Sequence, residues 1–374
     1  MPAKPTGEGA RFLLAGGGSG GHVIPLLAVA RELRRRGHSL FFVGTSRGLE
    51  NKLVPAEGFH LKLISVGGLN RVGLGRKLAT LAALPFATAK CLGLLRGVDA
   101  VFSIGGYAAG PPVMAALLRR TPVIVMEPNA VPGFTNRVIG RFVRRALVSF
   151  PETARFFAAG RAELTGLPVR EEFFQVPPKA PGGPFTVLVT GGSQGSRTLN
   201  RAVKESWPLF QRAGLPVRII HQTGPEACEA LRAEFAGTGL EGEVVPFIAA
   251  MPAVFAAADL IVCRSGAGAV SELAAAGKPA VLVPFPFAAD DHQTRNAEAM
   301  ERAGAARLVK DSEMTGQRLF AVVSELTAAP ETLAAMSHAA RRLARPGAAA
   351  RAAVILEETA HFRLTAAPRP ETIR

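Results

Sequence analysis

The chain has few of the residues on which several functional classes depend. Its cysteines, Cys91, Cys228 and Cys263, are odd in number and scattered, which argues against a disulfide framework or a zinc site and favours a reducing compartment. It has one tryptophan and one tyrosine, so base-stacking platforms made of these residues are not expected. No G-x-x-x-x-G-K-[ST] or Asp-x-Asp motif occurs, which excludes a P-loop nucleotidase and leaves no such motif for a metal ion. We therefore expect neither a metal nor another cofactor.

Long apolar runs are also missing. Residues 1–18 lack the long apolar core of a signal peptide. The longest apolar region, residues 78–95, contains Pro85 and Lys90 and is not expected to span a membrane. It is either buried within an α/β domain or rests on a bilayer surface. The second interpretation is suggested by the basic residues that flank it, which are Arg71, Arg76, Lys77 and Arg96.

Acidic residues are in the minority. The chain has 44 lysines and arginines against 29 aspartates and glutamates, a formal net charge of +15. Such an excess favours an anionic partner, namely nucleic acid, anionic lipid or a phosphorylated ligand, whereas arginines spread over solvated faces give the same charge without a partner. Because tryptophan and tyrosine for stacking on bases are so scarce, we expect no nucleic-acid partner. Hydrophobic residues make up 48% of the 374 residues and charged residues 20%, which indicates a globular protein of about two domains.

The chain does contain a pattern of apolar strands, glycine loops and helices that occurs twice. In the first half, strands are predicted at residues 12–15, 39–43, 101–104, 123–126 and 146–149. In the second half, they are predicted at residues 185–190, 217–221, 243–246, 260–263 and 280–283. This alternation indicates an α/β protein with two doubly wound, Rossmann-like domains. We place the domains at residues 1–168 and 169–346, followed by a helix and tail at 347–374, with the helix packing back on the first domain.

The two halves resemble each other in detail. FLLAGGGSGG (12–21) corresponds to VLVTGGSQGS (187–196), and residues 99–125 correspond to residues 259–283. Both of the latter segments contain an aspartate, an apolar strand, a glycine turn, a helix, a proline and a second strand. Two such domains are expected to place their loop edges at a common cleft, because open α/β sheets bind ligands at that edge.

The segment 259–296 carries the most informative turn. Its first strand runs into Ser265, Gly266 and Gly268 and then into a helix pattern. Glycines let the backbone approach a ligand closely, and the N–H groups at a helix N-terminus hold a phosphate or diphosphate. Glu272, just inside the helix, repels a phosphate but can accept hydrogen bonds from sugar hydroxyls. The turn is therefore either the site of a diphosphate joined to a ribose or an ordinary strand–helix turn with a surface glutamate.

The first glycine loop (residues 16–21) fits the dinucleotide pattern G-x-G-x-x-G. The acid expected at the end of the following strand is missing, since the first acid there is Glu50, and we therefore reject a nicotinamide site. His22 follows the loop directly, before a helix predicted to start near Ile24. A loop histidine at this edge suits a general base, and the alternative is a histidine that caps or packs the helix.

Five motifs in order resemble the MurG family of peptidoglycan glycosyltransferases, and the resemblance spans about residues 12–360. The motifs are GGGSGGH (16–22), SIGGYAAGP (103–111), GGSQGSR (191–197), CRSGAGAVSELAAAGKPA (263–280) and VPFPFAADDHQTRNA (283–297). The resemblance implies the GT-B fold, in which two Rossmann-like domains face each other across a cleft.

The same resemblance implies an inverting hexosyltransferase. It moves N-acetylglucosamine (GlcNAc) from UDP-GlcNAc to the C4 hydroxyl of MurNAc in undecaprenyl-diphosphate-MurNAc-pentapeptide, and so converts lipid I to lipid II. Two alternatives stay open. One is a related GT-B transferase that acts on another lipid or natural product, and the other is a non-catalytic UDP-sugar-binding module.

The resemblance also implies a cellular setting. The protein is expected in peptidoglycan synthesis, and therefore in cell wall biogenesis, cell shape and cell division, as a peripheral protein on the cytoplasmic face of the inner membrane. Its expected partners are UDP-GlcNAc, lipid I, an anionic membrane surface and other cell-wall synthesis proteins. The glycine loops at 16–21 and 105–110 hold the acceptor's diphosphate in this interpretation. Because the lipid tail stays in the bilayer, residues 74–95 are then interpreted as a membrane-docking surface with a basic rim.

Site residues follow from the resemblance as well. His22 is the catalytic base, with Glu127 as the competing candidate, and Arg170 or Arg264 stabilises the leaving diphosphate. Substrate contacts in the first domain are assigned to Ser19, Gly20, Gly21 and Asn129. Those in the second domain are assigned to Arg170, Ser193, Ile248, Ala267, Gly268, Ala269, Val270, Ser271, Glu272 and Gln293.

Within the second domain the resemblance distinguishes the parts of the donor. Ser193, in the third glycine loop (residues 191–196), contacts the diphosphate, and Ile248 packs on and hydrogen-bonds the uracil. Glu272 contacts the ribose hydroxyls, and Gln293 reaches the hydroxyls of the sugar.

The chain departs from the family pattern at two places. Met126 and Pro128 stand where the family has a histidine and a glutamine, so no role is carried over to them. Pro286 and Phe287 replace polar residues of some members, so substrate contacts are not assigned there.

Overall fold

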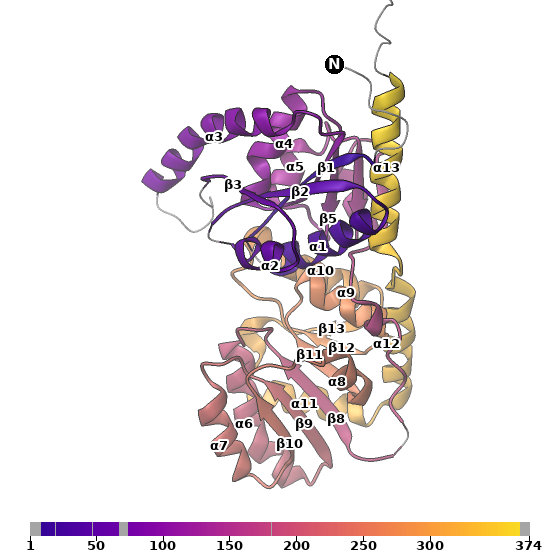
Figure 1. Cartoon of the computed structure of the whole chain (residues 1–374). Helices are drawn as coiled ribbons and strands as arrows, with labels where there is room; N and C mark the ends of the chain where they lie inside the picture. The colour runs from indigo at the N-terminus through magenta and orange to yellow at the C-terminus, as the bar shows by residue number, and fades with distance from the viewer. Residues whose placement is uncertain (1–8, 19, 47, 67–73, 181, 367–374) are drawn as a thin grey trace, which may run out of the picture. The chain divides into compact units, whose positions relative to one another are not determined.

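The computed structural model describes residues 9–18, 20–46, 48–66, 74–180 and 182–366 (Figure 1). The chain forms two compact units. The first unit is made of Met1–Pro168 together with Gly347–Arg374, and the second of Val169–Pro346. The chain leaves the first unit after Pro168 and returns to it at Gly347, so its last helix is part of the first unit.

Within the described residues, the sheet of the first unit has seven parallel strands in the order β3-β2-β1-β4-β5-β6-β7. The strands are Arg11–Gly16 (β1), Ser39–Gly44 (β2), Leu61–Leu63 (β3), Ala100–Gly105 (β4), Val123–Glu127 (β5), Arg145–Val148 (β6) and Ala162–Leu164 (β7). The order reverses between β1 and β4. Open α/β sheets bind ligands outside the carboxyl ends of the strands at such a reversal, and the first two glycine loops begin there.

Helices cover the faces of this sheet (Figure 1). Every residue of β4 is buried, as is typical of a central strand in a parallel sheet with helices on both sides. The helices are Gly20–Arg35 (α1), Glu50–Ala56 (α2), Leu74–Leu94 (α3), Gly110–Leu118 (α4), Phe134–Ile139 (α5) and Ala348–Ala366 (α13), with short 3-10 helices at Tyr107–Ala109 (η1) and Pro151–Phe156 (η2).

The C-terminal helix α13 is fixed to the first unit by charged side chains. Glu357 of α13 bonds to His38 Nε2 at 2.7 Å and accepts a hydrogen bond from Arg36 at 3.0 Å. Arg351 binds Glu163 of β7 through both carboxylate oxygens, at 2.6 and 3.0 Å. Together with the packing of α13 against α1 and β4, these pairs explain why the last helix belongs to the first unit.

Within the described residues, the sheet of the second unit has six parallel strands in the order β10-β9-β8-β11-β12-β13. They are Phe185–Thr190 (β8), Val217–Gln222 (β9), Glu241–Val245 (β10), Leu260–Cys263 (β11), Ala280–Leu282 (β12) and Ala306–Leu308 (β13). The order reverses between β8 and β11, and the third glycine loop and the turn at 265–268 follow these two strands. The second unit therefore repeats the arrangement of the first.

The helices of the second unit surround its sheet (Figure 1). They are Arg197–Ala213 (α6), Cys228–Ala236 (α7), Met251–Ala257 (α8), Ala267–Ala276 (α9), His292–Arg302 (α10), Gly316–Thr327 (α11) and Pro330–Leu343 (α12), with 3-10 helices at Glu171–Phe173 (η3), Ala289–Asp291 (η4) and Asp311–Glu313 (η5). The hydroxyl of Ser196 caps α6 by accepting the Leu199 N–H at 3.3 Å. Helix α9 ends at Ala276 and is followed by Gly277, whose φ of +62° is the left-handed conformation that glycine accommodates.

The predicted fold class is confirmed, with differences at the edges. Each predicted strand is present within two residues of its predicted bounds. Three further strands, β3, β7 and β13, were not predicted; each has three residues and lies at the edge of its sheet, which is too short for a periodic pattern. The start of α1 was predicted near Ile24 but lies at Gly20, so His22 belongs to the first turn of the helix.

The apolar region at 78–95 belongs to the single helix α3, which contains Pro85 and packs against α4. In the part of the chain that the structure describes, no single helix is both long and apolar enough to cross a membrane. One helix pair, Gly316–Thr327 with Pro330–Ala360, has the length and apolar composition of a membrane span when the two parts are taken together, but the pair bends by 95°.

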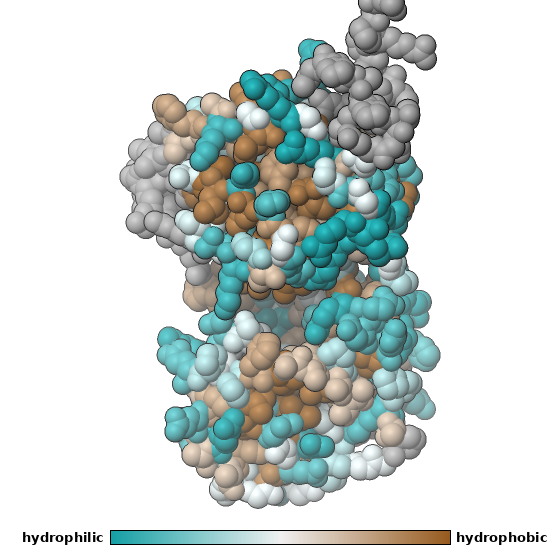
Figure 2. Space-filling model, viewed as in Figure 1, coloured by the Kyte–Doolittle hydropathy of each residue, from teal (hydrophilic) through white to brown (hydrophobic). Residues whose placement is uncertain are grey.

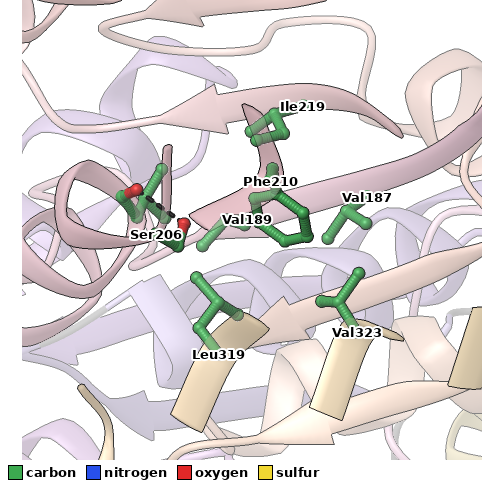
Figure 3. Close-up of a pocket in the computed structure, with 8 residues that line it drawn as sticks. Val187, Val189, Ser206, Phe210, Ile219, Leu319 and Val323 are labelled. Carbon is green, nitrogen blue, oxygen red and sulfur yellow. Dashed lines mark hydrogen bonds between the residues drawn. The ribbon is translucent and has the colours of Figure 1, made fainter. Parts of the chain in front are cut away.

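A small cavity lies in the core of the second unit, between the sheet and helices α6 and α11 (Figure 3). Its volume is about 10 Å³, and it is lined by Val187, Val189, Val203, Ser206, Phe210, Ile219, Leu319 and Val323. The hydroxyl of Ser206 is bonded to the Val203 carbonyl at 2.7 Å and so adds no group for a ligand. A space of one water volume with an apolar lining is a packing gap, not a binding site.

Candidate functional site

The first unit brings two glycine loops together at the carboxyl ends of β1 and β4. Gly106 follows β4 with φ of +81°. A Cβ atom at this position would lie 3.2 Å from the Gly17 carbonyl and 3.8 Å from Nδ1 of His22. The first loop, the second loop and the candidate base are therefore neighbours, and a side chain at Gly106 would crowd the other two.

The predicted site residues around the first glycine loop lie at or next to the start of α1. Gly20 and Gly21 are the first two residues of α1, whose N–H groups have no partner within the helix. His22, in the same turn, is partly exposed. Ser19 lies outside the described residues. An anion at the start of α1 would lie beside an imidazole, as a base acting near a diphosphate requires.

The carboxylate of Glu127 is at the end of β5 and is 2% exposed. Its Oε1 accepts hydrogen bonds from the N–H and Nδ2 of Asn129, at 3.0 and 3.1 Å. Its Oε2 accepts from the Gly133 N–H at 3.2 Å and from Asn136 Nδ2 at 2.9 Å. Burial raises the pKa of Glu127 to about 7, while the bonds from the two asparagines and Gly133 lower it.

This geometry bears on the choice of base. Each oxygen of Glu127 already serves two donors, so the side chain holds the segment 127–136 in place and positions Asn129. His22 is partly exposed in the first turn of α1, where a substrate can reach it, and it stays our candidate base. Met126, where the family has a histidine, is fully buried in the sheet.

In the second unit, a buried glutamine connects two segments of the predicted donor site. Gln222, at the end of β9, is 2% exposed. Its Nε2 donates to Thr190 Oγ1 at 3.0 Å and to the Gly192 carbonyl at 2.9 Å. Its Oε1 accepts the Ile248 N–H at 2.8 Å. Gln222 thus fixes the loop of Ser193, whose side chain is exposed, relative to Ile248.

The turn after β11 has the form that the sequence predicted. Helix α9 begins at Ala267, directly after Gly266, and the predicted contact residues Ala267, Gly268, Ala269, Val270, Ser271 and Glu272 form its first six positions. Glu272 is partly buried, and its pKa is raised to about 7. Burial is the larger effect and raises the pKa, whereas the positive charge of Arg170 lowers it. The structure therefore places Arg170 within electrostatic reach of Glu272. Arg170 is itself exposed and stacks over the Phe173 ring at 5.0 Å.

Gln293 lies in the first turn of α10, and polar contacts tie it to the turn at 265–268. Its Oε1 accepts the Phe285 N–H at 3.0 Å, and its carbonyl accepts the Ser265 hydroxyl at 2.8 Å. A Cβ at Gly266 would lie 4.0 Å from its Nε2. The amide nitrogen of Gln293 therefore lies beside the start of α9, as a residue that reads the sugar next to a diphosphate requires.

Arg264 was one of two candidates for stabilising a leaving diphosphate, and the structure gives it other contacts. Its guanidinium donates to the carbonyls of Val283 and Pro284, both at 3.1 Å. It also pairs with Asp311 at 2.5 Å and donates to the Ser196 hydroxyl at 2.7 Å. These contacts hold the third glycine loop to the strands beside it. Arg170 is consequently the candidate with a guanidinium available at the surface.

Sequence reasoning missed two residues that organise these loops, Gln222 and Glu50. Gln222 is the last residue of β9, at the carboxyl edge of the sheet where ligands bind, and that position was a usable signal. Glu50 was noted only as an acid in the wrong place for a ribose. Its contacts with the first glycine loop depend on how β2 and α2 pack, which no local pattern shows.

Family models match both units. The model of the glycosyltransferase family 28 N-terminal domain matches residues 12–148, and that of the family 28 C-terminal domain matches residues 186–353. Together they cover most of the chain and both glycine-loop edges.

Individual proteins match over nearly the whole length. A UDP-N-acetylglucosamine–N-acetylmuramyl-(pentapeptide) pyrophosphoryl-undecaprenol N-acetylglucosamine transferase from Solibacter usitatus (strain Ellin6076) is 68% identical over 351 residues, which is 94% of this chain and 96% of the relative. The protein of the same description from Myxococcus xanthus (strain DK1622) is 42% identical over 345 residues, covering 91% of this chain and 90% of the relative.

Solved structures agree with this relationship. The crystal structure of Acinetobacter baumannii MurG matches with a TM-score of 0.79 and 33% identity, covering 93% of this chain and 99% of that one. CalG4, the calicheamicin glycosyltransferase, matches with a TM-score of 0.68 at 20% identity, which shows a common fold. The chain therefore belongs to glycosyltransferase family 28, in the group of its UDP-N-acetylglucosamine–N-acetylmuramyl-(pentapeptide) pyrophosphoryl-undecaprenol N-acetylglucosamine transferases.

Proposed function

We propose that the chain transfers GlcNAc from UDP-GlcNAc to the C4 hydroxyl of MurNAc in undecaprenyl-diphosphate-MurNAc-pentapeptide, with inversion at the anomeric carbon. The observation that carries the proposal is the 68% identity to a transferase of that description over 94% of the chain. The geometry of the second unit supports it, because a glycine turn, a helix N-terminus and Glu272 follow one another at the sheet reversal. That order suits a diphosphate joined to a ribose.

The donor half of the reaction belongs to the second unit. The N–H groups at the start of α9 bind the diphosphate of the donor. Glu272 accepts hydrogen bonds from the ribose hydroxyls, and Ile248 contacts the uracil. Arg170 supplies a positive charge for the leaving UDP, and Gln293 binds the sugar. Fixed donors of this kind stabilise the charge that develops on the leaving group without reorganising during the reaction.

The acceptor half belongs to the first unit. The N-terminus of α1 and the second glycine loop hold the diphosphate of the acceptor, and His22 removes the proton of the attacking hydroxyl. Asn129, held by Glu127, contributes to substrate binding at the end of β5.

A transfer assay tests this proposal. The protein is incubated with UDP-GlcNAc and a soluble lipid I analogue, and the release of UDP and the formation of the disaccharide are measured together. UDP release that depends on the analogue supports the proposal. UDP-GlcNAc binding without any transfer would leave a UDP-sugar-binding module, and transfer only to a different acceptor would leave a related transferase.

We further propose that the protein acts as a peripheral protein on the cytoplasmic face of the inner membrane. Hydrophobic side chains are exposed on the first unit, and Figure 2 shows such residues gathered on one of its faces. The exposed hydrophobic residues of the first unit include Phe86 (80% exposed), Leu118 (66%) and Phe142 (62%). Exposed arginines lie close to Leu118 and Phe142 in the sequence, namely Arg119, Arg120, Arg137, Arg141 and Arg144. Apolar residues with a basic rim suit a surface of anionic lipid.

Vesicle sedimentation tests this localisation. The protein should sediment with phosphatidylglycerol vesicles and stay in solution with phosphatidylcholine vesicles. Phe142→Ser should weaken sedimentation, whereas Phe247→Ser, at an exposed phenylalanine of the second unit, should not. Equal sedimentation with both lipids, or no effect of Phe142→Ser, would contradict a docking surface on the first unit.

A further inference from the structure

A buried carboxylate lies against the first glycine loop. Glu50 is the first residue of α2 and is 1% exposed. Its Oε2 accepts the Gly18 N–H at 2.8 Å, and its Oε1 accepts the N–H and the hydroxyl of Thr45 at 2.9 and 2.8 Å. In the opposite direction, the Leu49 N–H donates to the Gly18 carbonyl at 3.2 Å. The start of α2 therefore holds Gly18 by both its N–H and its carbonyl.

Three glycines make room for this carboxylate. A Cβ atom at Gly17, Gly44 or Gly48 would overlap the side chain of Glu50. These glycines belong to three different segments, which are the first glycine loop, the end of β2 and the turn before α2. Their shared neighbour indicates that the absence of side chains here serves Glu50 at least as much as any ligand.

The same network reaches the second glycine loop through Tyr107. The Thr45 hydroxyl has one hydrogen, and it donates that hydrogen to Glu50. The contact of 3.2 Å between Thr45 Oγ1 and the Tyr107 hydroxyl is therefore donated by Tyr107. The Tyr107 ring also lies beside Gly18, since a Cβ there would be 3.3 Å from the ring. One buried charge thus connects the two loops that meet at His22.

From these contacts we propose that Glu50 is a positioning residue that sets the first glycine loop in the geometry needed to bind the diphosphate-carrying acceptor. The inference rests on the proposed function, which assigns this loop to the acceptor. Glu50 does not touch substrate in this role, because its oxygens are bonded to Gly18 and Thr45. It acts by fixing Gly18, and through Gly18 the direction of the N–H groups at the start of α1.

The substitution Glu50→Gln separates this role from general stability. An amide has one acceptor oxygen, and the position of Oε1 serves two donors whereas that of Oε2 serves one. The amide oxygen of the Glu50→Gln variant will therefore take the Oε1 position, which turns the NH₂ group toward the Gly18 N–H. The contacts with Thr45 are kept and the contact with the loop is lost. Glu57→Gln is the matched control, because Glu57 ends the same helix and pairs with Arg31 on the surface.

The experiment measures three properties of the full-length protein. They are kcat/KM for a lipid I analogue, the Kd for UDP-GlcNAc, and hydrogen–deuterium exchange of a peptide spanning residues 16–22. For Glu50→Gln we expect kcat/KM for the acceptor to fall at least tenfold, the Kd for the donor to stay within twofold, and exchange of the loop to speed up. Glu57→Gln should leave all three unchanged, and Thr45→Val should show the same acceptor-specific loss to a smaller extent.

The outcomes separate this inference from the proposed function. Acceptor kinetics and loop exchange that are unchanged in Glu50→Gln overturn the role of Glu50. A parallel loss of donor affinity and acceptor kinetics also overturns it, because that indicates general destabilisation. If Glu50→Gln does not fold, Thr45→Val decides by the same criteria. If the unmodified protein transfers no GlcNAc, the proposed function fails, and loop exchange still decides whether Glu50 fixes the loop.

Discussion

The affinity for UDP-GlcNAc should depend on pH through Glu272. Burial raises the pKa of this carboxyl to about 7, and the ionised form is the better acceptor for two ribose hydroxyls. About one-tenth of the groups are ionised at pH 6 and about nine-tenths at pH 8. If only the ionised form binds well, the Kd falls roughly tenfold from pH 6 to pH 8, which corresponds to about 1.4 kcal/mol.

Isothermal titration calorimetry with UDP-GlcNAc measures this dependence. UDP-GlcNAc is preferable to UDP, because each of its phosphates carries a sugar ester on one side and the phosphoanhydride on the other and so does not titrate near neutral pH, whereas a terminal phosphate titrates near pH 6. Glu272→Gln should bind more weakly at pH 8 by about 1–3 kcal/mol and should lose the pH dependence. His292→Gln, next to Gln293, is the control and should keep it.

Two results would refute this reasoning. One is a Kd that is independent of pH in the unmodified protein, and the other is a pH dependence that persists in Glu272→Gln. Stability provides an independent check with the opposite sign. Because the folded pKa lies above the ordinary 4.5, the folded protein keeps a proton that the unfolded chain has released between about pH 4.5 and 7. Stability contributed by this group therefore falls as the pH rises through that window. Glu272→Gln should remove this share of the fall, whereas the share of Glu127, whose pKa is also raised to about 7, should persist.

Three further substitutions test other parts of the structure. His22→Ala should lower kcat by at least about a hundredfold with an unchanged Kd for UDP-GlcNAc, since a base acts only in the reaction; an equal loss in both would make His22 a binding residue. Gln222→Ala should weaken UDP-GlcNAc binding by about 1–2 kcal/mol while leaving the acceptor KM unchanged, because it releases the third glycine loop and Ile248. Glu357→Ala should lower the free energy of unfolding by about 1–3 kcal/mol, measured by urea denaturation, because it leaves His38 and Arg36 without their contact on α13; Glu358→Ala, an exposed neighbour, should change it by less than about 0.5 kcal/mol.

The fold was largely predictable because its main signals are local. Central strands such as β1, β8 and β11 are short apolar runs that lead into glycine loops, and the internal repeat shows that the runs form two equivalent sheets. The order of the strands was not predicted, and the observed reversal beside the first strand of each sheet is typical of doubly wound sheets. The edge strands β3, β7 and β13 were missed, because each has only three residues and a segment that short shows no repeating pattern of apolar side chains.

The candidate site was predictable only where the backbone of a glycine turn or a helix start forms the binding group. The turn before Glu272 and the glycine loops could be located because glycine content and a following helix are visible in sequence. The partners of Arg264 and Gln222 could not be, because they come from segments separated along the chain. Those of Glu127 lie within nine residues of it, but no periodic pattern shows which groups its carboxylate accepts from. Arg264 illustrates the difference: the family resemblance offered it as one of two arginines for the leaving diphosphate, and only the structure shows that its guanidinium contacts Ser196 and Asp311.

The two units support their glycine loops in related ways but with different charge. In each, the strand next to the loop strand leads to a buried polar side chain, Glu50 after β2 and Gln222 at the end of β9. Gln222 is neutral and bonds to the Gly192 carbonyl, so it takes no N–H of its loop away from a ligand. Glu50 is a carboxylate and occupies the Gly18 N–H.

This difference predicts unequal attraction for anions. A buried negative charge close to the first loop lowers the local positive potential and removes one donor, whereas Gln222 does neither to the third loop. The first loop should therefore bind a free diphosphate more weakly than the third loop does. A transferase whose lipid-linked product must leave after every turnover benefits from a weak acceptor site, because its affinity can come from the sugar, the peptide and the membrane surface while the diphosphate mainly sets the orientation.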